Sequence, residues 1–537
     1  MLYIHCKHQV HYKMRVKQQK EDDMASRKTF LGIELGSTRI KGVVIDAHHR
    51  VVSSGDHTWQ SNLENGVWTY SLDDVWDGLK SALQQIDGCG NVCAAGISAM
   101  MHGYLAFDKE WNLLVPFRTW QNTITGQAAE ALTDRFHFNI PQRWSIAHLY
   151  QAILNGEPHV KNIAHITTLA GYVHYMLTGE NVLGVGDASG MFPIDNEHVD
   201  YDADMLRSFD ALSSEKGFHQ KLCDLLPRVL SAGDSAGVLT EKGSALLDRA
   251  LPTGLSFAPP EGDAGTGMVA TNAVAPRTGN VSAGTSIFSM VVLENPLRRV
   301  YSEIDMVTTP TGAPVAMVHC NNCTGDMNAW MELFRETAEL FGSEVPRHEL
   351  FTRLYQKSLE GDADCGGTVV CNYLAGEGVT HMDEGRPIVV RQPNSRFTLG
   401  NFLRAQLYST MATMRIGMDL LSGEDVAIDR LTGHGGLFKT PVVGQRIMAA
   451  ACNTPIICME TAGDGGPYGM ALLTAYMCLK REGETLETYL DERVFADAAQ
   501  TSVSPYVEDV AGFATYLERF KKVLAVEQVA VNSFVEG

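Results

Sequence analysis

Two glycine turns, one in each half of the chain, carry hydroxyl side chains between two apolar runs. They consist of Gly36, Ser37 and Thr38 in the first half, and of Gly284, Thr285 and Ser286 in the second. An apolar run on each side of a short turn predicts a β-hairpin at both places. Such turns expose backbone N–H groups that can hold a phosphate group. Either turn alone is explained equally well as a hairpin without a ligand, whereas the pair predicts two lobes that close on one nucleotide.

Two acidic residues have the chemistry that phosphoryl transfer requires. Glu34 directly precedes the first turn, where its carboxylate could hold Mg²⁺ beside the phosphates, and Lys41 could add positive charge. Asp263 lies in a Pro- and Gly-rich segment over 257–267, which predicts a loop. A carboxylate there could accept the proton of an attacking alcohol. The alternatives are a surface acid for Glu34 and a loop aspartate bound to its own turn for Asp263.

Further glycine turns occur later in the chain, at 433–436 and at 462–466. Each is expected to open a helix, and Thr440 with Pro441 is expected to cap the first of these helices. Bare backbone at such turns lets a phosphate or a planar base approach closely. A single turn is explained by strand-to-helix geometry, but four turns with two acids are harder to explain as packing.

Two short polar segments could bind the hydroxyl groups of a substrate. They are Met101, His102 and Gly103 at a predicted strand end, and Trp120, Gln121 and Asn122 shortly after it. Imidazole and amide groups can hydrogen-bond hydroxyls, and the indole of Trp120 offers an apolar wall. A histidine with a purely structural role is the alternative for His102.

The elements expected to position these residues are mixed in type, which predicts an α/β lobe at the start of the chain. Apolar periodicity and turn residues predict three strands within 30–54, helices over 75–86, 167–178 and 401–421, a strand over 92–97, and a helical, partly amphipathic C-terminal stretch after about 483. The best lobe boundary follows the 257–267 segment, and the second lobe is expected to begin near Arg277.

Composition limits the class of protein. The chain has 537 residues, enough for two domains, and a formal net charge of −20, which argues against a nucleic-acid partner. The eleven cysteines are scattered and favour reduced thiols in a cytoplasmic protein, and the CxxC pair Cys320 and Cys323 has no second pair nearby to complete a metal site. No uninterrupted apolar run is long enough to predict a membrane span. Residues 1–28 are basic and polar, and are expected to form an extended or disordered tail.

Together, these residues resemble the FGGY carbohydrate kinase family from about residue 29 to about residue 480. The first family motif has Asp, Gly, Thr and a basic residue, and residues 34–41 match it with Glu34 in place of the Asp. The Gly-Asp motif matches Gly262 and Asp263. The second phosphate motif matches 284–286, and the adenosine motif matches 433–436.

The resemblance implies the two-lobed actin/Hsp70-like, ribonuclease H-like α/β ATPase fold. It implies a sugar and phosphate lobe over 29–276 and a nucleotide lobe over 277–537. It also implies Asp263 as general base, ATP and Mg²⁺ as cofactors, Glu34 and Asp263 at the metal, and a small sugar as the partner, while a homodimer stays open. The residues expected at the ATP are Gly36, Ser37, Thr38, Lys41, Gly284, Thr285, Ser286, Gly433, Gly435, Gly436 and Asn453. Those expected at the sugar are Met101, His102, Gly103, Trp120, Gln121, Asn122 and Asp263.

The expected reaction moves the γ-phosphoryl group of ATP to a hydroxyl of a ketopentose. Met101-His102-Gly103 is similar to the sugar motif of xylulokinases and favours D-xylulose, whereas Gln121-Asn122 departs from their usual Asn-Asp and leaves L-ribulose open. Another sugar, a polyol or a sugar acid is the next alternative. A chaperone-like or filament-forming ATPase with the same fold is a distant one, because it would need neither Asp263 nor the sugar motif.

Overall fold

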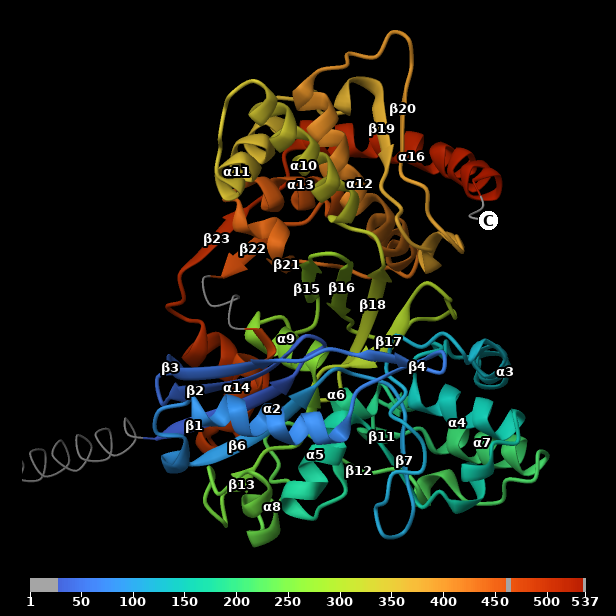
Figure 1. Ribbon diagram of the computed structural model, residues 1–537, viewed down its shortest axis with the longest axis vertical. Coiled ribbons are helices and arrows are strands. Elements are labelled where there is room, and N and C mark those ends of the chain that lie inside the picture. Colours follow the sequence, from blue (N-terminus) through green and yellow to red (C-terminus); the bar gives the residue numbers. More distant parts are fainter. Residues whose placement is uncertain (1–27, 460–464, 535–537) are drawn as a thin grey trace, which may run out of the picture. The chain divides into compact units, whose positions relative to one another are not determined.

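The computed structural model describes residues 28–459 and 465–534, which form two compact units (Figure 1). The first unit contains the described residues of 1–270, 308–312 and 464–497, and the second contains those of 271–307, 313–463 and 498–537. Residues 465–497 thus pack with the first unit, although the sequence analysis placed them in the C-terminal lobe. The expected tail, apart from Lys28, and most of the glycine turn at 462–466 lie outside the described residues.

The first unit contains fourteen described strands and ten described α-helices. The strands are β1 (Thr29–Leu35), β2 (Arg39–Asp46), β3 (Val51–Thr58), β4 (Asn62–Glu64), β5 (Val67–Thr69), β6 (Ala94–Ala99), β7 (Leu105–Phe107), β8 (His165–Thr167), β9 (Val182–Gly184), β10 (Ile194–Asp195), β11 (Asp200–Tyr201), β12 (Arg228–Leu230), β13 (Ser256–Phe257) and β14 (Glu261–Gly262). The helices are α2 (Leu72–Gln84), α3 (Gly126–Phe136), α4 (Ser145–Leu154), α5 (Leu169–Thr178), α6 (Val185–Ala188), α7 (Ala203–Ser214), α8 (Glu241–Leu246), α9 (Asp263–Ala270), α14 (Gly465–Leu479) and α15 (Leu486–Tyr489).

The main sheet of the first unit has the strand order β13-β6-β1-β2-β3, and β14 also pairs with β6. β1, β2 and β3 are antiparallel neighbours, whereas β6 runs parallel to β1, β13 and β14. The strands β1 and β6 are buried along nearly their whole length, which is why they read as continuous apolar runs.

Helix α14 packs closely on this sheet, beside β1 and β6 (Figure 1). Gly32 of β1 makes the approach possible, because a Cβ atom there would stand 2.1 Å from the backbone oxygen of Pro467 and 2.3 Å from the backbone nitrogen of Ala471. The helix has almost no polar face, since nearly all residues from Gly466 to Tyr476 are buried. A segment from late in the chain therefore completes the core of the first unit.

The second unit is built on one seven-stranded sheet with the order β17-β18-β16-β15-β21-β22-β23. Its strands are β15 (Thr278–Ala283), β16 (Ile287–Val292), β17 (Asp305–Thr308), β18 (Pro314–Cys320), β21 (Arg430–His434), β22 (Ile456–Met459) and β23 (Gln500–Val503), and a separate pair is formed by β19 (Thr368–Cys371) and β20 (Ile388–Arg391). Its helices are α10 (Gly325–Leu340), α11 (Arg347–Ser358), α12 (Leu399–Ser422), α13 (Val443–Cys452) and α16 (Val507–Ser533). The long helix α12 is buried over most of its length and lies in the core of the unit.

The predicted helices over 75–86, 167–178 and 401–421 correspond to α2, α5 and α12, whereas two other local predictions are wrong. Ser71 caps α2 by accepting a hydrogen bond from the backbone N–H of Asp73, and Thr168 caps α5 in the same manner. The predicted cap at Thr440 is wrong, because α13 begins at Val443 after Val442, whose φ is +70°. The segment expected as a loop over 257–267 contains two short strands and the start of α9. Among the described residues, no helix has the length and apolarity that a membrane span requires.

Candidate functional site

The carboxyl ends of three parallel strands bring the predicted catalytic residues together in the first unit. Leu35 of β1 and Gly262 of β14 are both register partners of Ala99 at the end of β6. Parallel strands that end in register deliver the residues that follow them to the same edge of the sheet. Glu34, Met101 and Asp263 therefore gather at one edge, although 229 residues separate the first from the last.

Asp263 lies directly after β14 and begins helix α9, where the sequence predicted a loop. Its Oδ1 accepts a hydrogen bond of 3.2 Å from the backbone N–H of Met101. Burial raises the pKa of Asp263 to about 6, and backbone N–H groups, including that of Met101, act in the opposite direction. A half-buried carboxylate with a pKa close to neutrality is suited to accept a proton from a bound hydroxyl.

Glu34 is the residue of β1 that lies opposite Lys41 of β2. Its pKa is raised to about 8, mainly by burial and secondly by the charge of Asp263, while Lys41 lowers it. The carboxylate lies against the first turn of α14, because a Cβ atom on Gly466 would stand only 1.5 Å from Glu34 Oε2. Glutamate at position 34 is longer than the aspartate of the family motif, and it fits because position 466 is a glycine.

A second pair of buried acids, Asp187 and Glu261, was missed by the sequence analysis. The backbone N–H of Asp187 donates to Glu261 Oε2 at 3.0 Å, and Thr168 Oγ1 donates to Asp187 Oδ2 at 2.6 Å. Asp187 Oδ1 and Glu261 Oε1 have no hydrogen-bond partner among the described residues. Burial is the main cause that raises the pKa of Asp187 to about 7 and that of Glu261 to about 8. Glu261 precedes the Gly-Asp motif by one residue, which is the signal that could have found it.

The segment at Met101, His102 and Gly103 is fixed by backbone and ring contacts. His102 has a φ of +69°, an uncommon conformation for a residue other than glycine. Its Nδ1 is 3.1 Å from the carbonyl oxygen of Gly190, and its ring stacks on Trp144. The backbone N–H of Gly103 donates to the carbonyl oxygen of Arg143. Strain held by several contacts at once is typical of functional sites.

The first hydroxyl turn is held by aromatic donors that sequence reasoning did not single out. Trp59 Nε1 donates to the carbonyl oxygen of Gly36 at 2.7 Å. The hydroxyl of Tyr70 donates to the carbonyl oxygen of Ser37, also at 2.7 Å. Trp120 Nε1 donates to Ser37 Oγ at 3.3 Å, which places this predicted sugar residue beside the turn. The turn is therefore rigid, and Thr38 at its tip is exposed.

Gln121 and Asn122, which follow Trp120, differ in the hydrogen bonds of their side chains. Asn122 is buried, and its amide group donates to the carbonyl oxygens of Trp68 and Thr119, while its oxygen accepts from the backbone N–H of Trp68. Both N–H bonds of Asn122 are thus used to hold the fold. Gln121 Oε1, by contrast, is buried without a partner among the described residues and can accept a hydrogen bond from a ligand.

In the second unit, the structure brings the second hydroxyl turn and the 433–436 turn together. β15 and β21 are parallel, and Ser282 is the register partner of His434. A Cβ atom on Gly435 would stand 2.5 Å from the carbonyl oxygen of Ala283. The carbonyl oxygen of Gly284 accepts hydrogen bonds from the N–H and the hydroxyl of Thr324, which immediately precedes α10.

Asn453 does not join that group of residues. It follows α13 and precedes β22, which runs parallel to β21, so it lies at the amino-terminal edge of the sheet. The 433–436 turn lies at the carboxyl-terminal edge. With a φ of +50°, Asn453 ends α13 in the left-handed conformation that asparagine tolerates. The structure thus gives Asn453 a capping position instead of a place beside the phosphate turns.

The described part of the chain offers few side chains that could bind a metal ion together. Within 28–459 and 465–534, no group of three or more His, Cys, Asp or Glu residues could hold a metal ion. This includes the CxxC pair, whose cysteines are both buried, with thiol pKa values raised mainly by burial. Glu34 and Asp263 fit an ion that takes most of its ligands from phosphate oxygens and water, as Mg²⁺ does.

Comparisons with known proteins identify the family of the chain. The family model of the N-terminal domain of the FGGY family of carbohydrate kinases matches residues 29–252, and that of the C-terminal domain matches residues 279–478. A curated xylulose kinase from Haemophilus influenzae is 22% identical, with 91% of this chain and 99% of that protein covered.

Solved structures show the same fold. The ligand-bound xylulose kinase from Lactobacillus acidophilus has a TM-score of 0.78 and 15% identity, and covers 95% of this chain and 100% of its own. The gluconate kinase from the same organism has a TM-score of 0.77 and 15% identity over the same shares. The expected fold class, the two-lobed actin-like α/β ATPase fold, is confirmed. With both domain models matched, the chain belongs to the FGGY family of carbohydrate kinases.

Proposed function

We propose that this phosphotransferase moves the γ-phosphoryl group of ATP to a hydroxyl group of a ketopentose, with D-xylulose as the first candidate. The single observation that carries the proposal is the position of Asp263, which meets Met101 and Glu34 at the end of three parallel strands. A general base, a sugar motif and a metal-site acid at one sheet edge are the parts that such a transfer needs.

In the proposed reaction, the hydroxyl oxygen of the sugar bonds to the γ-phosphorus atom of ATP while Asp263 accepts the hydroxyl proton. The bond from that phosphorus to the β–γ bridging oxygen breaks, and ADP leaves with this oxygen. Glu34, with Asp263 beside it, would hold Mg²⁺, which neutralises charge on the phosphates when bound. The turns at 36–38 and 284–286 donate N–H and hydroxyl hydrogen bonds to phosphate oxygens. Lys41, opposite Glu34, adds positive charge on the same strand pair.

We assign the sugar to residues of the first unit and the adenosine to residues of the second, while each unit contributes one turn to the phosphates. Met101, His102 and Gly103 would contact the sugar, with Trp120 as an apolar wall and Gln121 Oε1 as a hydrogen-bond acceptor. Gly433, Gly435 and Gly436 would lie against the adenosine. We leave Asn122 out of the sugar contacts, because its amide N–H groups already bind backbone oxygens.

The choice of D-xylulose is supported by the sugar motif and by the named activities of relatives that cover most of the chain. L-Ribulose is the second candidate, since Gln121 and Asn122 depart from the pattern of xylulokinases. Gluconate and glycerol are further acceptors to test, because similar kinases are named for them.

The test compares Asp263→Asn with wild-type protein in an assay of ADP release with each acceptor and with none. Loss of a general base is expected to lower kcat by about 10²–10⁴-fold while binding of MgATP persists. Asp74→Asn, an exposed aspartate of α2, is the matched control and should have no effect. Acceptor-dependent turnover near the wild-type rate in Asp263→Asn would remove Asp263 as the base, and turnover without any acceptor would favour a non-kinase ATPase.

A further inference from the structure

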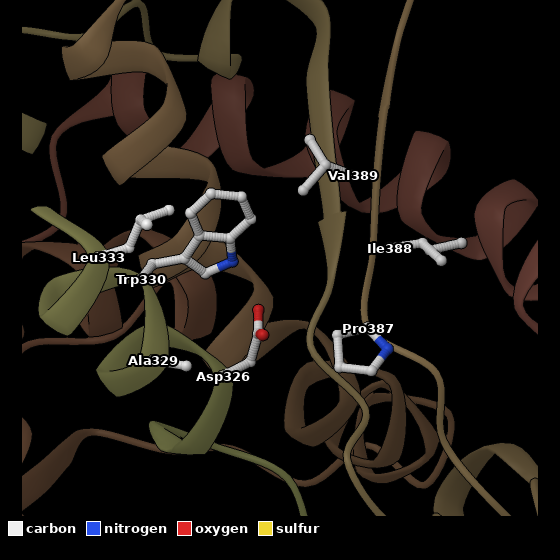
Figure 2. A pocket seen from close by; sticks show the side chains of 7 residues that line it. All are labelled: Asp326, Ala329, Trp330, Leu333, Pro387, Ile388 and Val389. Carbon is white, nitrogen blue, oxygen red and sulfur yellow. The ribbon is translucent and has the colours of Figure 1, made fainter.

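Two adjoining pockets lie in the second unit between α10, β20 and the start of α12. The smaller one, of about 230 Å³, is lined by Asp326, Trp330 and Leu333 on one side and by Pro387 and Val389 on the other (Figure 2). The larger one, of about 530 Å³, shares Trp330 and Val389 with it. Its volume is within the range of about 300–1,000 Å³ that is typical of sites for small organic ligands.

The larger pocket, here called the Trp330 pocket, is lined by aromatic rings. Phe402 is buried in its floor, and three further rings meet it edge to face: Trp330 at 4.8 Å, Phe334 at 6.1 Å and Phe397 at 6.2 Å between centroids. Phe397 is 53% exposed and Leu399 is 43% exposed, so apolar surface is open to solvent. Ring edges and faces arranged in this manner complement a planar aromatic ligand.

The rim of the Trp330 pocket carries one cation. The guanidinium carbon of Arg391 lies 4.8 Å from the ring centroid of Phe397, which fixes its position beside the aromatic wall. Arg391 is exposed and makes no salt bridge with any described carboxylate. The acid in the smaller pocket, Asp326, is buried and does not line the Trp330 pocket. The pocket therefore combines an aromatic interior with a positive charge at one end.

We propose that the Trp330 pocket binds a planar aromatic anion, whose ring lies among Trp330, Phe334 and Phe397 and whose anionic group pairs with Arg391. The five N–H donors of the guanidinium favour a carboxylate or a sulfonate at that position. The binding part of this proposal is independent of the proposed kinase function.

A consequence for nucleotide binding follows from helix α10, and this part rests on the proposed function. The residues just before α10 hold the second hydroxyl turn, because the backbone N–H of Cys323 donates to the carbonyl oxygen of Thr285 at 3.0 Å and Thr324 Oγ1 donates to that of Gly284 at 2.8 Å. Trp330 and Phe334 belong to the same helix. A ligand in the pocket is therefore expected to change the KM for ATP and to leave the KM for the sugar unchanged.

The test uses the full chain and the fluorescent aromatic anion 8-anilinonaphthalene-1-sulfonate as probe. Trp330 is the sole tryptophan in the sequence of the second unit, so energy transfer that is lost in Trp330→Phe reports this site. We expect saturable binding of one probe per chain, weakened about tenfold in Arg391→Gln by loss of a charge-assisted hydrogen bond. Phe397→Ser should weaken it similarly, whereas Phe341→Ser, which removes an exposed ring that does not line the pocket, should have no effect.

Three results would overturn the proposal. Equal affinity in wild type, Arg391→Gln and Phe397→Ser would place the probe on another surface. Competitive displacement by MgATP would make the pocket part of the nucleotide site itself. Equal affinity for the uncharged N-phenyl-1-naphthylamine would remove the role of Arg391. None of these readouts needs kinase activity, so they test the pocket independently of the proposed function.

Discussion

Placing a methyl group at position 466 should displace Glu34, and shortening Glu34 should relieve the effect. The Cβ of an alanine at position 466 would lie 1.5 Å from Glu34 Oε2, whereas ordinary contacts to a Cβ begin near 3.4 Å. The carboxylate must therefore move by about 2 Å or the first turn of α14 must shift. Aspartate at position 34 withdraws the carboxylate by one C–C bond, about 1.5 Å, which is most of the distance needed.

The magnitude follows from the cost of overpacking. Inserting a methyl group into filled space costs about 1–3 kcal/mol. If that strain is relieved by moving Glu34 away from the position proposed to hold Mg²⁺, Gly466→Ala should lower kcat/KM for MgATP by about 5- to 150-fold. Glu34→Asp alone should lower it by less than about tenfold, because the carboxylate is kept. The double variant should recover most of the activity that Gly466→Ala loses, so the effects of the two changes should fall short of additivity by about 1 kcal/mol or more.

The assay is acceptor-dependent ADP release at varied MgATP, combined with thermal unfolding of each variant. Recovery is expected to be incomplete, because the new Cβ would also lie 3.0 Å from Thr266 Oγ1. Gly378→Ala is the matched control, since a Cβ there meets no atom within 4 Å and should change neither readout. If the effects of Gly466→Ala and Glu34→Asp simply multiply, the contact between the two positions does not set the position of the carboxylate and the reasoning fails.

Two further predictions concern other parts of the molecule. Gly435→Ala should raise the KM for ATP more than about tenfold and leave the KM for the sugar unchanged. The reason is that position 435 has a φ of +99° and lies against the backbone of Ala283. A change confined to the KM for the sugar would contradict the assignment of the adenosine to this turn. His148 is buried, and burial, aided by the charge of Arg118, lowers its pKa from 6.5 to about 3. Its contribution to stability is thus complete above pH 6.5 and is lost as the pH falls below that value, by about 1.4 kcal/mol per pH unit. Denaturant unfolding between pH 7 and pH 5 should show a shallower loss in His148→Leu, and an unchanged slope would disprove this role.

Local patterns in the sequence were sufficient for elements that neighbouring residues determine. The glycine and hydroxyl residues at 36–38 and 284–286 predicted the hairpins of β1 with β2 and of β15 with β16, because a turn between apolar runs is a short-range signal. The Gly-Asp motif singled out Asp263 as a candidate, but it did not predict that this residue begins α9. The strand before it is only two residues long and follows two prolines, so proline spacing hid the element.

Contacts between residues far apart in the sequence could not be predicted from local patterns. Asp187 and Glu261 are 74 residues apart, and nothing local shows that the backbone of one binds the side chain of the other. Local patterns also do not show which polar residues hold the fold. Asn122 holds Trp68, and Asn453 ends a helix, although both are polar and were expected at the ligand.

The packing of α14 on the sheet of the first unit has a consequence for how the chain folds while it is being synthesised. Leu35 at the end of β1 and Gly465 at the start of α14 are 430 residues apart in sequence. During translation, the apolar face of β1 and β6 stays exposed until α14, near the end of the polypeptide, has left the ribosome. An N-terminal fragment that stops at the boundary between the two halves should therefore aggregate when expressed alone. Supplying the missing helical segment as a separate chain should restore its solubility.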